Sequence, residues 1–242
     1  MIKRVRRLAQ RLGYDLSPLK KARDLDRQIV AALKANSIDL VVDVGANQGQ
    51  YAQRLRRAGW AGPILSIEPL QDLNQHLSRR ARSDAAWHIA PPLALGDRDG
   101  RARLMRSAES DMSSVLEQNA LMQRVSPSSA IVGTVDVPLY RFETLELPVE
   151  NDARLFLKLD VQGYEAAVLE GVGARWPSIH GLQLEMALVP VYQGEVLWRE
   201  MVDRLAARGF EVTLVLPGYF EPKLARQLQC DGVFFRNPAS AS

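Results

Sequence analysis

The chain has 242 residues, of which 47% are hydrophobic and 24% charged, as is usual for a globular protein with one large domain. No apolar run approaches the roughly 20 residues that a membrane-spanning helix needs, so we expect a cytoplasmic protein. The single cysteine excludes a disulfide framework, and the three histidines lie too far apart for metal-ligand spacing, so no metal site is expected.

Positive charge is concentrated at the N-terminus. Residues 1–36 hold ten Lys and Arg against three Asp and Glu, a net of +7, whereas the whole chain has a net charge of +3. This segment predicts either an anchor on an acidic membrane surface or a helix packed on the domain edge with a solvated basic face. Nucleic-acid binding is not expected, because the positive charge is local and no aromatic residues interleave with it. At helical spacing within it lie Ile2, Val5, Leu8, Ala9 and Leu12.

From residue 40 onwards, strand and helix patterns alternate. Because most of the strands are apolar throughout, we expect a parallel sheet with helices on both faces. With no internal repeat or linker in the pattern, residues 37–242 are predicted to form one domain after the helical extension 1–36. The predicted strands are 40–44, 62–69, 87–97 (broken at Pro91-Pro92), 101–107, 134–142, 154–161, 179–186, 210–216 and 231–236, and the predicted helices are 48–59, 70–82, 164–172 and 195–208.

The turn after the first strand, "DVGANQG" (43–49), combines an acid with two glycines. A dinucleotide fold would show G-x-G-x-x-G, whose glycines admit a pyrophosphate to the helix N-terminus. Here one glycine is missing, and Asp43 would repel a phosphate but attract a ligand with an amino group and a sulfonium. Glu68, 23 residues past Gly45 at the end of the second strand, can accept hydrogen bonds from both hydroxyls of a ribose.

This combination favours S-adenosylmethionine as the ligand, bound at the carboxyl ends of the strands beside the first strand. Glu68 alone does not discriminate, because NAD-binding folds carry an acid at the same distance. An NAD-type Rossmann oxidoreductase therefore stays open as an alternative. In a purely structural alternative, Asp43 hydrogen-bonds the turn and the glycines only make it tight.

The stretch "VVDVGANQGQYAQRLRRAGWAGPILSIEP" (41–69) resembles the first two motifs of the FkbM family of S-adenosylmethionine-dependent methyltransferases. The likeness continues through "ALGD" (94–97), "SSVL" (113–116), "FLKLDVQGYEAAVLEGV" (156–172) and "LQCDGVFFR" (228–236). It implies the Rossmann-like class I methyltransferase fold, a seven-stranded, mostly parallel sheet whose last strand is antiparallel. It also implies methyl transfer to oxygen, often on sugars of glycolipids, polysaccharides or natural products. A non-catalytic donor-binding protein is the alternative, which the intact acids argue against.

Carried over position by position, the resemblance assigns most of the donor site. Glu68 would hold the ribose, and Pro69 would fix the chain that leaves it. Asp97 could equally be a turn residue. The methionine part would lie against Asp43, Gly45, Ala46, Asn47 and Gly49, and the adenine would be flanked by Leu95, Gly96 and Asp97.

The chemistry calls for a group that takes the proton of an alcohol acceptor, because the sulfonium methyl group is already electrophilic. Asp160, at the end of the fourth strand beside the cleft, is the first candidate, and Glu185, at the end of the fifth, is the second. Lys158 lies on the same strand face as Asp160 and could pair with it or with a neighbouring acid. The alternative is that these acids form a buried polar network that holds the strand ends.

The acceptor is predicted to meet the polar, serine-rich segment 108–133, which has the composition of a mobile lid or of an ordinary surface loop. Ser113 and Ser114 match a serine pair of the family, Gln162 follows the fourth strand, and Tyr192 could stack on a sugar ring. The sequence thus predicts a metal-independent O-methyltransferase for a small-molecule or glycan acceptor.

Overall fold

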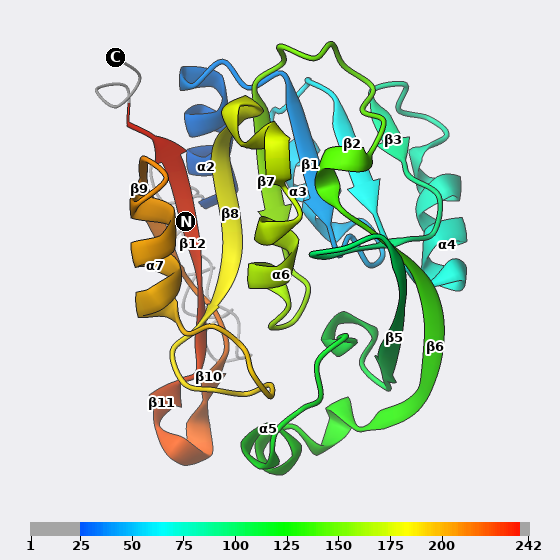
Figure 1. Ribbon diagram of the computed structural model, residues 1–242, viewed down its shortest axis with the longest axis vertical. Helices are drawn as coiled ribbons and strands as arrows, with labels where there is room; N and C mark the ends of the chain where they lie inside the picture. The colour runs from blue at the N-terminus through cyan, green and yellow to red at the C-terminus, as the bar shows by residue number, and fades with distance from the viewer. Residues whose placement is uncertain (1–24, 238–242) are drawn as a thin grey trace, which may run out of the picture.

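The computed structural model describes residues 25–237. A seven-stranded sheet in the order β3-β2-β1-β7-β8-β12-β9 forms its centre (Figure 1). The strands from β3 to β8 pair in parallel, and β12 runs antiparallel to both β8 and β9. The mostly parallel sheet with an antiparallel last strand is therefore confirmed. The strands are β1 (Leu40–Val44), β2 (Ile64–Ile67), β3 (Trp87–Ile89), β7 (Leu155–Leu159), β8 (Ile179–Ala187), β9 (Phe210–Pro217) and β12 (Gln229–Arg236).

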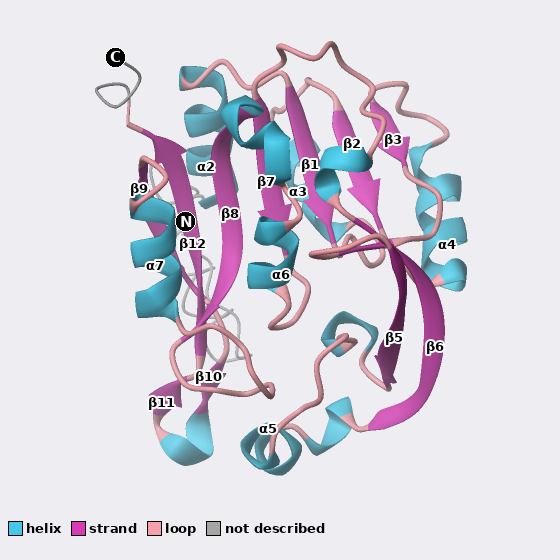
Figure 2. Cartoon of the chain, in the orientation of Figure 1, coloured by secondary structure: helices cyan, strands magenta, loops and turns pink. Residues whose placement is uncertain are grey.

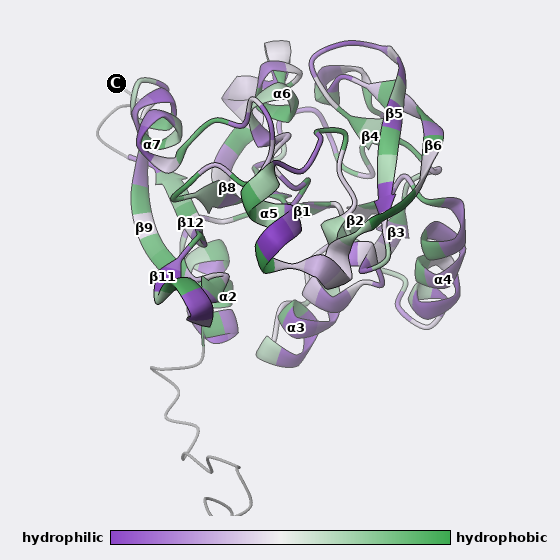
Figure 3. Ribbon diagram, turned by 90° about the horizontal axis from the view of Figure 1, so that it is seen from below, coloured by the Kyte–Doolittle hydropathy of each residue, from purple (hydrophilic) through white to green (hydrophobic). Residues whose placement is uncertain are grey.

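Helices cover both faces of this sheet (Figures 2 and 3). Successive residues of a strand point to opposite faces, so the neighbouring side chains of Val41 and Val42 lie in two different apolar clusters. The sheet thus separates two apolar cores. On one face lie α2 (Leu25–Ala35), α3 (Gln50–Ala58) and α4 (Gln71–Ala81), and on the other α6 (Glu165–Glu170) and α7 (Trp198–Ala206).

The first described helix, α2, belongs to the globular domain. Its side chains Ile29 and Leu33 are fully buried in the same core as α3. Asp26 also pairs with Arg54 of α3, with 2.9 Å between Oδ1 and Nε. The predicted boundary at residue 36 therefore falls after a helix that is already part of the core. The predicted amphipathic face at residues 2–12 lies outside the described residues.

A second, three-stranded sheet follows β3, in the order β4-β6-β5. The sequence pattern treated 87–97 as one interrupted strand, but its two halves join different sheets. Proline has no backbone N–H to donate to a ladder, so the Pro91-Pro92 pair separates them. The strands are β4 (Ala94–Leu95), β5 (Gly100–Ser107) and β6 (Ile131–Tyr140).

The polar segment between β5 and β6 folds into short helices. Met122 is fully buried and packs with Val191, Tyr192 and Leu228. The segment is thereby anchored to the loop after β8. The short elements of the chain are η2 (Ser110–Met112), α5 (Ala120–Val125), η3 (Pro127–Ser129), η4 (Phe142–Thr144), η5 (Gly173–Ser178), β10 (Phe220–Glu221), η6 (Pro222–Leu224) and β11 (Arg226–Gln227). Across residues 25–237, none of the helices is both long and apolar enough to cross a bilayer.

Candidate functional site

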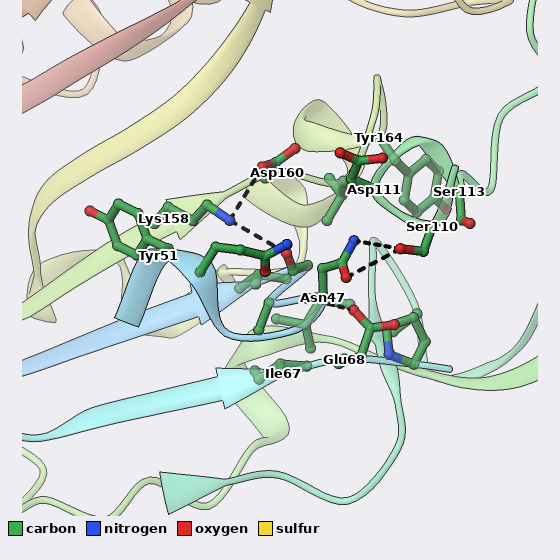
Figure 4. A pocket seen from close by; sticks show the side chains of 18 of the residues that line it. Asn47, Tyr51, Ile67, Glu68, Ser110, Asp111, Ser113, Lys158, Asp160 and Tyr164 are labelled. Carbon is green, nitrogen blue, oxygen red and sulfur yellow. Dashed lines mark hydrogen bonds and ion pairs between the residues drawn. The ribbon is translucent and has the colours of Figure 1, made fainter. Parts of the chain in front are cut away.

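A cavity of about 330 Å³ opens at the carboxyl ends of β1, β2 and β7 (Figure 4). Its lining comes from the turns after these strands and from residues of α3, β4, β5, η2, β8 and β12. This is the edge at which open α/β sheets bind their ligands. The segments that the sequence singled out therefore meet at one cavity.

The turn after β1 brings the backbone against the end of β7. Gly45 has φ +71°, and a Cβ on it would lie 1.9 Å from the carbonyl oxygen of Asp160, so a side chain does not fit. Ala46 and Asn47 follow it along the cavity wall. The Asn47 side-chain amide donates to Ser110 Oγ of η2 at 3.2 Å. The turn thus leaves its backbone accessible to a ligand, and Asn47 links the turn to η2.

Glu68 is held by two backbone amides. Its Oε1 accepts from the N–H of Leu70 and its Oε2 from the N–H of Asn47, both at 2.9 Å. Burial raises the pKa of Glu68 to about 7, although the two backbone hydrogen bonds oppose that rise. Each oxygen keeps a free lone pair, so the carboxylate can accept from the two hydroxyls of a ribose.

One end of the cavity is apolar. Here Leu95 lines the wall together with Leu93 and Leu104. Gly96 lies outside the lining and packs on Leu139 and Tyr164. Asp97 is also outside the lining, because its carboxylate lies at the surface and pairs with Arg98 at 3.0 Å. These apolar walls suit the flat, weakly polar face of an adenine. The surface position of Asp97 agrees with the alternative in which it is a turn residue.

Asp43 does not face the cavity. It is fully buried, and its Oδ1 pairs with Lys158 Nζ at 3.0 Å. Burial acts to lower the pKa of Lys158, but the charges of Asp43 and Asp160 more than offset this and hold the pKa above its ordinary value. The expectation that Asp43 itself meets the cationic donor is corrected, because Lys158 already neutralises it.

Asp160 is one of the carboxylates that line the cavity. Its side chain is 43% accessible, and both of its oxygens have partners. Lys158 Nζ lies 3.4 Å from Oδ2, and Gln162 Nε2 donates to Oδ1 at 2.9 Å. An acceptor group that enters the cavity can therefore meet a carboxylate of fixed orientation.

Gly49 and Ser114 serve packing rather than the lining. A Cβ on Gly49 would lie 2.7 Å from the ring of Trp87 and 2.9 Å from Leu77, on the side of α3 and α4. Ser114 is buried and its Oγ donates to the carbonyl of Gln162 at 2.7 Å. Of the predicted serine pair, only Ser113 lines the cavity.

Tyr192, Gln162 and Glu185 lie behind the lining. Tyr192 is 1% exposed, so it has no free face to stack on a sugar ring. Gln162 and Gln229 both donate to Glu185 Oε2, at 3.1 and 2.7 Å. Burial, and then the charges of Asp160 and Glu165, raise the pKa of Glu185 well above its ordinary value. Glu185 does not border the cavity, which corrects its assignment as a base in favour of the polar-network alternative.

The sequence reading missed the polar end of the cavity. Tyr51 OH donates to Gln183 Oε1 at 2.8 Å, and Gln183 Nε2 donates to Asp231 Oδ2 at 3.1 Å. Arg54 completes this wall. A buried glutamine in β8 and a largely buried aspartate in β12 were the available signal, but only pairing across these two strands brings them together.

The sheet order, the glycine turn and the buried acid at the end of β2 define a class I methyltransferase. The methyltransferase FkbM domain model matches residues 43–212, and the chain belongs to that family. It is therefore a methyltransferase that uses S-adenosylmethionine, whose parts fit the glycine turn, Glu68 and the apolar walls. The NAD-type alternative is discarded.

Solved methyltransferase structures resemble the chain at low identity. The magnesium protoporphyrin IX methyltransferase of Synechocystis PCC 6803 with bound SAH shows 11% identity and a TM-score of 0.48 over 98% of this chain and 100% of that one. A SAM-dependent methyltransferase from Aquifex aeolicus shows 14% identity and 0.42 over 89% and 92%. The 1,6-didemethyltoxoflavin-N1-methyltransferase of Burkholderia thailandensis shows 11% and 0.44 over 89% and 80%. A search of curated proteins returned no match.

Proposed function

We propose that the enzyme methylates a hydroxyl oxygen of a sugar, a glycolipid or polysaccharide, or a secondary metabolite. The observation that carries the proposal is the Asp160 carboxylate, which lies on the donor cavity with both oxygens held. Bound S-adenosylmethionine supplies an electrophilic methyl group. A neutral amine already offers a lone pair, whereas an alcohol has to lose its proton, so a positioned carboxylate favours an alcohol acceptor.

Asp160 would take the hydroxyl proton at its exposed edge. Lys158 and Gln162 contact one oxygen each, which leaves lone pairs on both oxygens available to an acceptor. The positive charge of Lys158 favours the ionised carboxylate, the form that can act as a base. These residues would orient the acceptor oxygen and hold its proton, and alignment of the two substrates would contribute the remaining acceleration.

The polar end of the cavity supports a hydroxyl-rich acceptor. Gln183, Asp231 and Arg54 offer an amide, a carboxylate and a guanidinium within one wall. Such groups donate to and accept from hydroxyls in several directions, as recognition of a sugar requires. We therefore place glycans and small polyols first among the acceptors.

The proposal is tested with methyl-labelled S-adenosylmethionine and a panel of free hexoses, nucleoside diphosphate sugars and lipid-linked sugars. Amino sugars belong in the panel because they offer nitrogen and oxygen in one molecule. We expect label in an O-methyl ether, located by mass spectrometry, and strongly reduced labelling by the Asp160→Asn variant. Label on nitrogen, or equal labelling by that variant, would contradict the proposal. Metal independence stays a prediction, which a parallel reaction with a chelator tests.

A further inference from the structure

Behind Asp160, outside the cavity lining, lies a connected set of polar side chains that the proposed reaction does not use directly. It consists of Gln162, Glu185, Tyr192 and Gln229. Gln162 and Gln229 are 7% and 3% exposed, and they come from the turn after β7 and from β12. Buried polar groups are hydrogen-bonded, and an unpaired one is costly. The arrangement of these side chains is therefore fixed rather than adaptable.

The amide of Gln162 has one orientation. Tyr192 OH donates to its Oε1 at 2.8 Å, so the NH₂ group points the other way, towards the two carboxylates. Its Nε2 has two hydrogens and two acceptors, Asp160 Oδ1 at 2.9 Å and Glu185 Oε2 at 3.1 Å. Both amide hydrogens and one lone pair of Oε1 are thus used within the network.

The backbone of the same residue is also held. Gln162 has φ +56°, in the left-handed region that non-glycine residues rarely adopt, and Ser114 Oγ donates to its carbonyl at 2.7 Å. Backbone strain of this kind persists where the surroundings determine it, and it gathers at functional sites. Here the left-handed conformation places the Gln162 side chain within hydrogen-bond distance of Asp160.

We propose that Gln162 is the positioning residue that fixes the Asp160 carboxylate, with Tyr192 and Glu185 setting the direction of its amide. This inference rests on the proposed function, in which Asp160 receives the proton of the acceptor. Lys158 holds the second oxygen, so loss of Gln162 frees the carboxylate to rotate about its remaining contact.

The first experiment separates this role from a structural one. Gln162→Met keeps the length of the side chain and removes the amide. We expect turnover to fall by about tenfold to a hundredfold, as for misplaced reacting groups. Affinity for S-adenosylhomocysteine should stay within a few-fold, because Gln162 does not line the cavity. The matched control, Gln75→Met at an exposed position of α4 outside the network, should keep the turnover of the wild type.

The second experiment shows whether Gln162 acts through Asp160. The double variant Asp160→Asn/Gln162→Met should be no slower than Asp160→Asn alone, since an orienting group is redundant once its target is lost. Full turnover of Asp160→Asn would overturn the assignment of the base and the proposed function. A slow Asp160→Asn with an unaffected Gln162→Met, or additive losses in the double variant, would overturn the positioning role alone.

A spectroscopic readout makes the test independent of the acceptor. In the complex with S-adenosylhomocysteine, the side-chain amide of Gln162 is assigned in ¹⁵N–¹H NMR spectra by its absence from Gln162→Met. We expect the resonance to shift in both Asp160→Asn and Tyr192→Phe, and to be unchanged in Gln75→Met. An amide signal that does not respond to Asp160→Asn would show that the contact is not formed, and the inference would fail.

Discussion

Lys158 and Asp43 form a buried ion pair at matching positions of two neighbouring strands. They are register partners in β7 and β1, and their charged atoms lie 3.0 Å apart. The side chain of Lys158 is 8% accessible and that of Asp43 fully buried. Lys158 also contacts Asp160. Its ammonium group therefore compensates the buried charge of Asp43 and holds the candidate base.

We therefore expect Lys158→Met to destabilise the fold strongly. Removal of one partner leaves a buried carboxylate uncompensated, at a cost of about 3 to 5 kcal/mol in the free energy of unfolding. Urea denaturation measures the change. The surface variant Lys223→Met serves as control and should lie within about 0.5 kcal/mol of the wild type. The double variant Asp43→Asn/Lys158→Met should recover part of the loss. No recovery would show that the lysine stabilises the fold through other contacts.

Donor affinity should depend on pH through Glu68, whose pKa burial raises to about 7. Ribose hydroxyls donate to the ionised form, so binding favours ionisation. Affinity for S-adenosylhomocysteine should rise by about tenfold between pH 6 and pH 8. Calorimetry in buffers of different ionisation enthalpy measures both the affinity and the released proton.

Glu68→Gln should lose this pH dependence and weaken binding by about 1.5 to 3 kcal/mol, because charged hydrogen bonds are replaced by neutral ones. In the ligand-free wild type, the stability of the fold depends on pH with the opposite sign to donor affinity. The folded-state pKa exceeds the ordinary value of 4.5, so the contribution of Glu68 to stability falls as pH rises from there to about 7. An affinity that is flat across this range in the wild type would contradict the assignment.

The two acids that the sequence offers as candidate bases should behave differently. Asp160→Asn should lower turnover by about a hundredfold or more while donor affinity stays within a few-fold, as expected for a base. Glu185→Gln keeps an acceptor for Gln162 and Gln229 and mimics a protonated carboxyl group, so its turnover should change by a few-fold at most. Steady-state kinetics with an acceptor from the panel measures the turnover of both variants. Equal losses in both variants would return Glu185 to the list of bases.

Local sequence patterns predicted much of the fold and of the candidate donor site. The glycine turn and the acid at the end of β2 lie within one βαβ unit, so their spacing alone brings Gly45 and Glu68 to the same edge of the sheet. Leu95 and Asp97 are two residues apart, yet one lines the cavity and the other lies at the surface. That difference follows from the pairing of β4 with β6, more than 40 residues later, which no local pattern encodes.

The residues behind the site could not be assigned for the same reason. Gln162 and Tyr192 each looked like an acceptor contact, because a polar group and an aromatic ring after a strand suit a sugar. Their 30-residue separation in the chain hides the fact that they hydrogen-bond to one another. Gln183 and Asp231 were missed because they lie 48 residues apart in the chain, and only the pairing of β8 with β12 brings them together.

The close approach of Gly45 to the end of β7 can be tested against a second glycine. Both Gly45 and Gly59 have positive φ, but a Cβ on Gly59 would meet nothing within 4 Å. Gly59→Ala should therefore cost only about 1 kcal/mol of stability from backbone strain. Gly45→Ala must also push the carbonyl of Asp160 away, so donor affinity should fall by about tenfold or more. Calorimetry with S-adenosylhomocysteine distinguishes the two, and an unchanged affinity in Gly45→Ala would separate this turn from the donor site.

The last prediction concerns residues 1–24, which hold eight Lys and Arg against two Asp. Because Ile29 and Leu33 belong to the core, the informative truncation begins at residue 25 rather than after the whole basic extension. We expect the truncated enzyme to fold and to bind S-adenosylhomocysteine as the full chain does. Both proteins should stay in the supernatant when sedimented with anionic vesicles. Pelleting of the full chain alone, at low but not at high salt, would instead show an electrostatic membrane anchor, since exposed charges are screened beyond about 8 Å at physiological ionic strength.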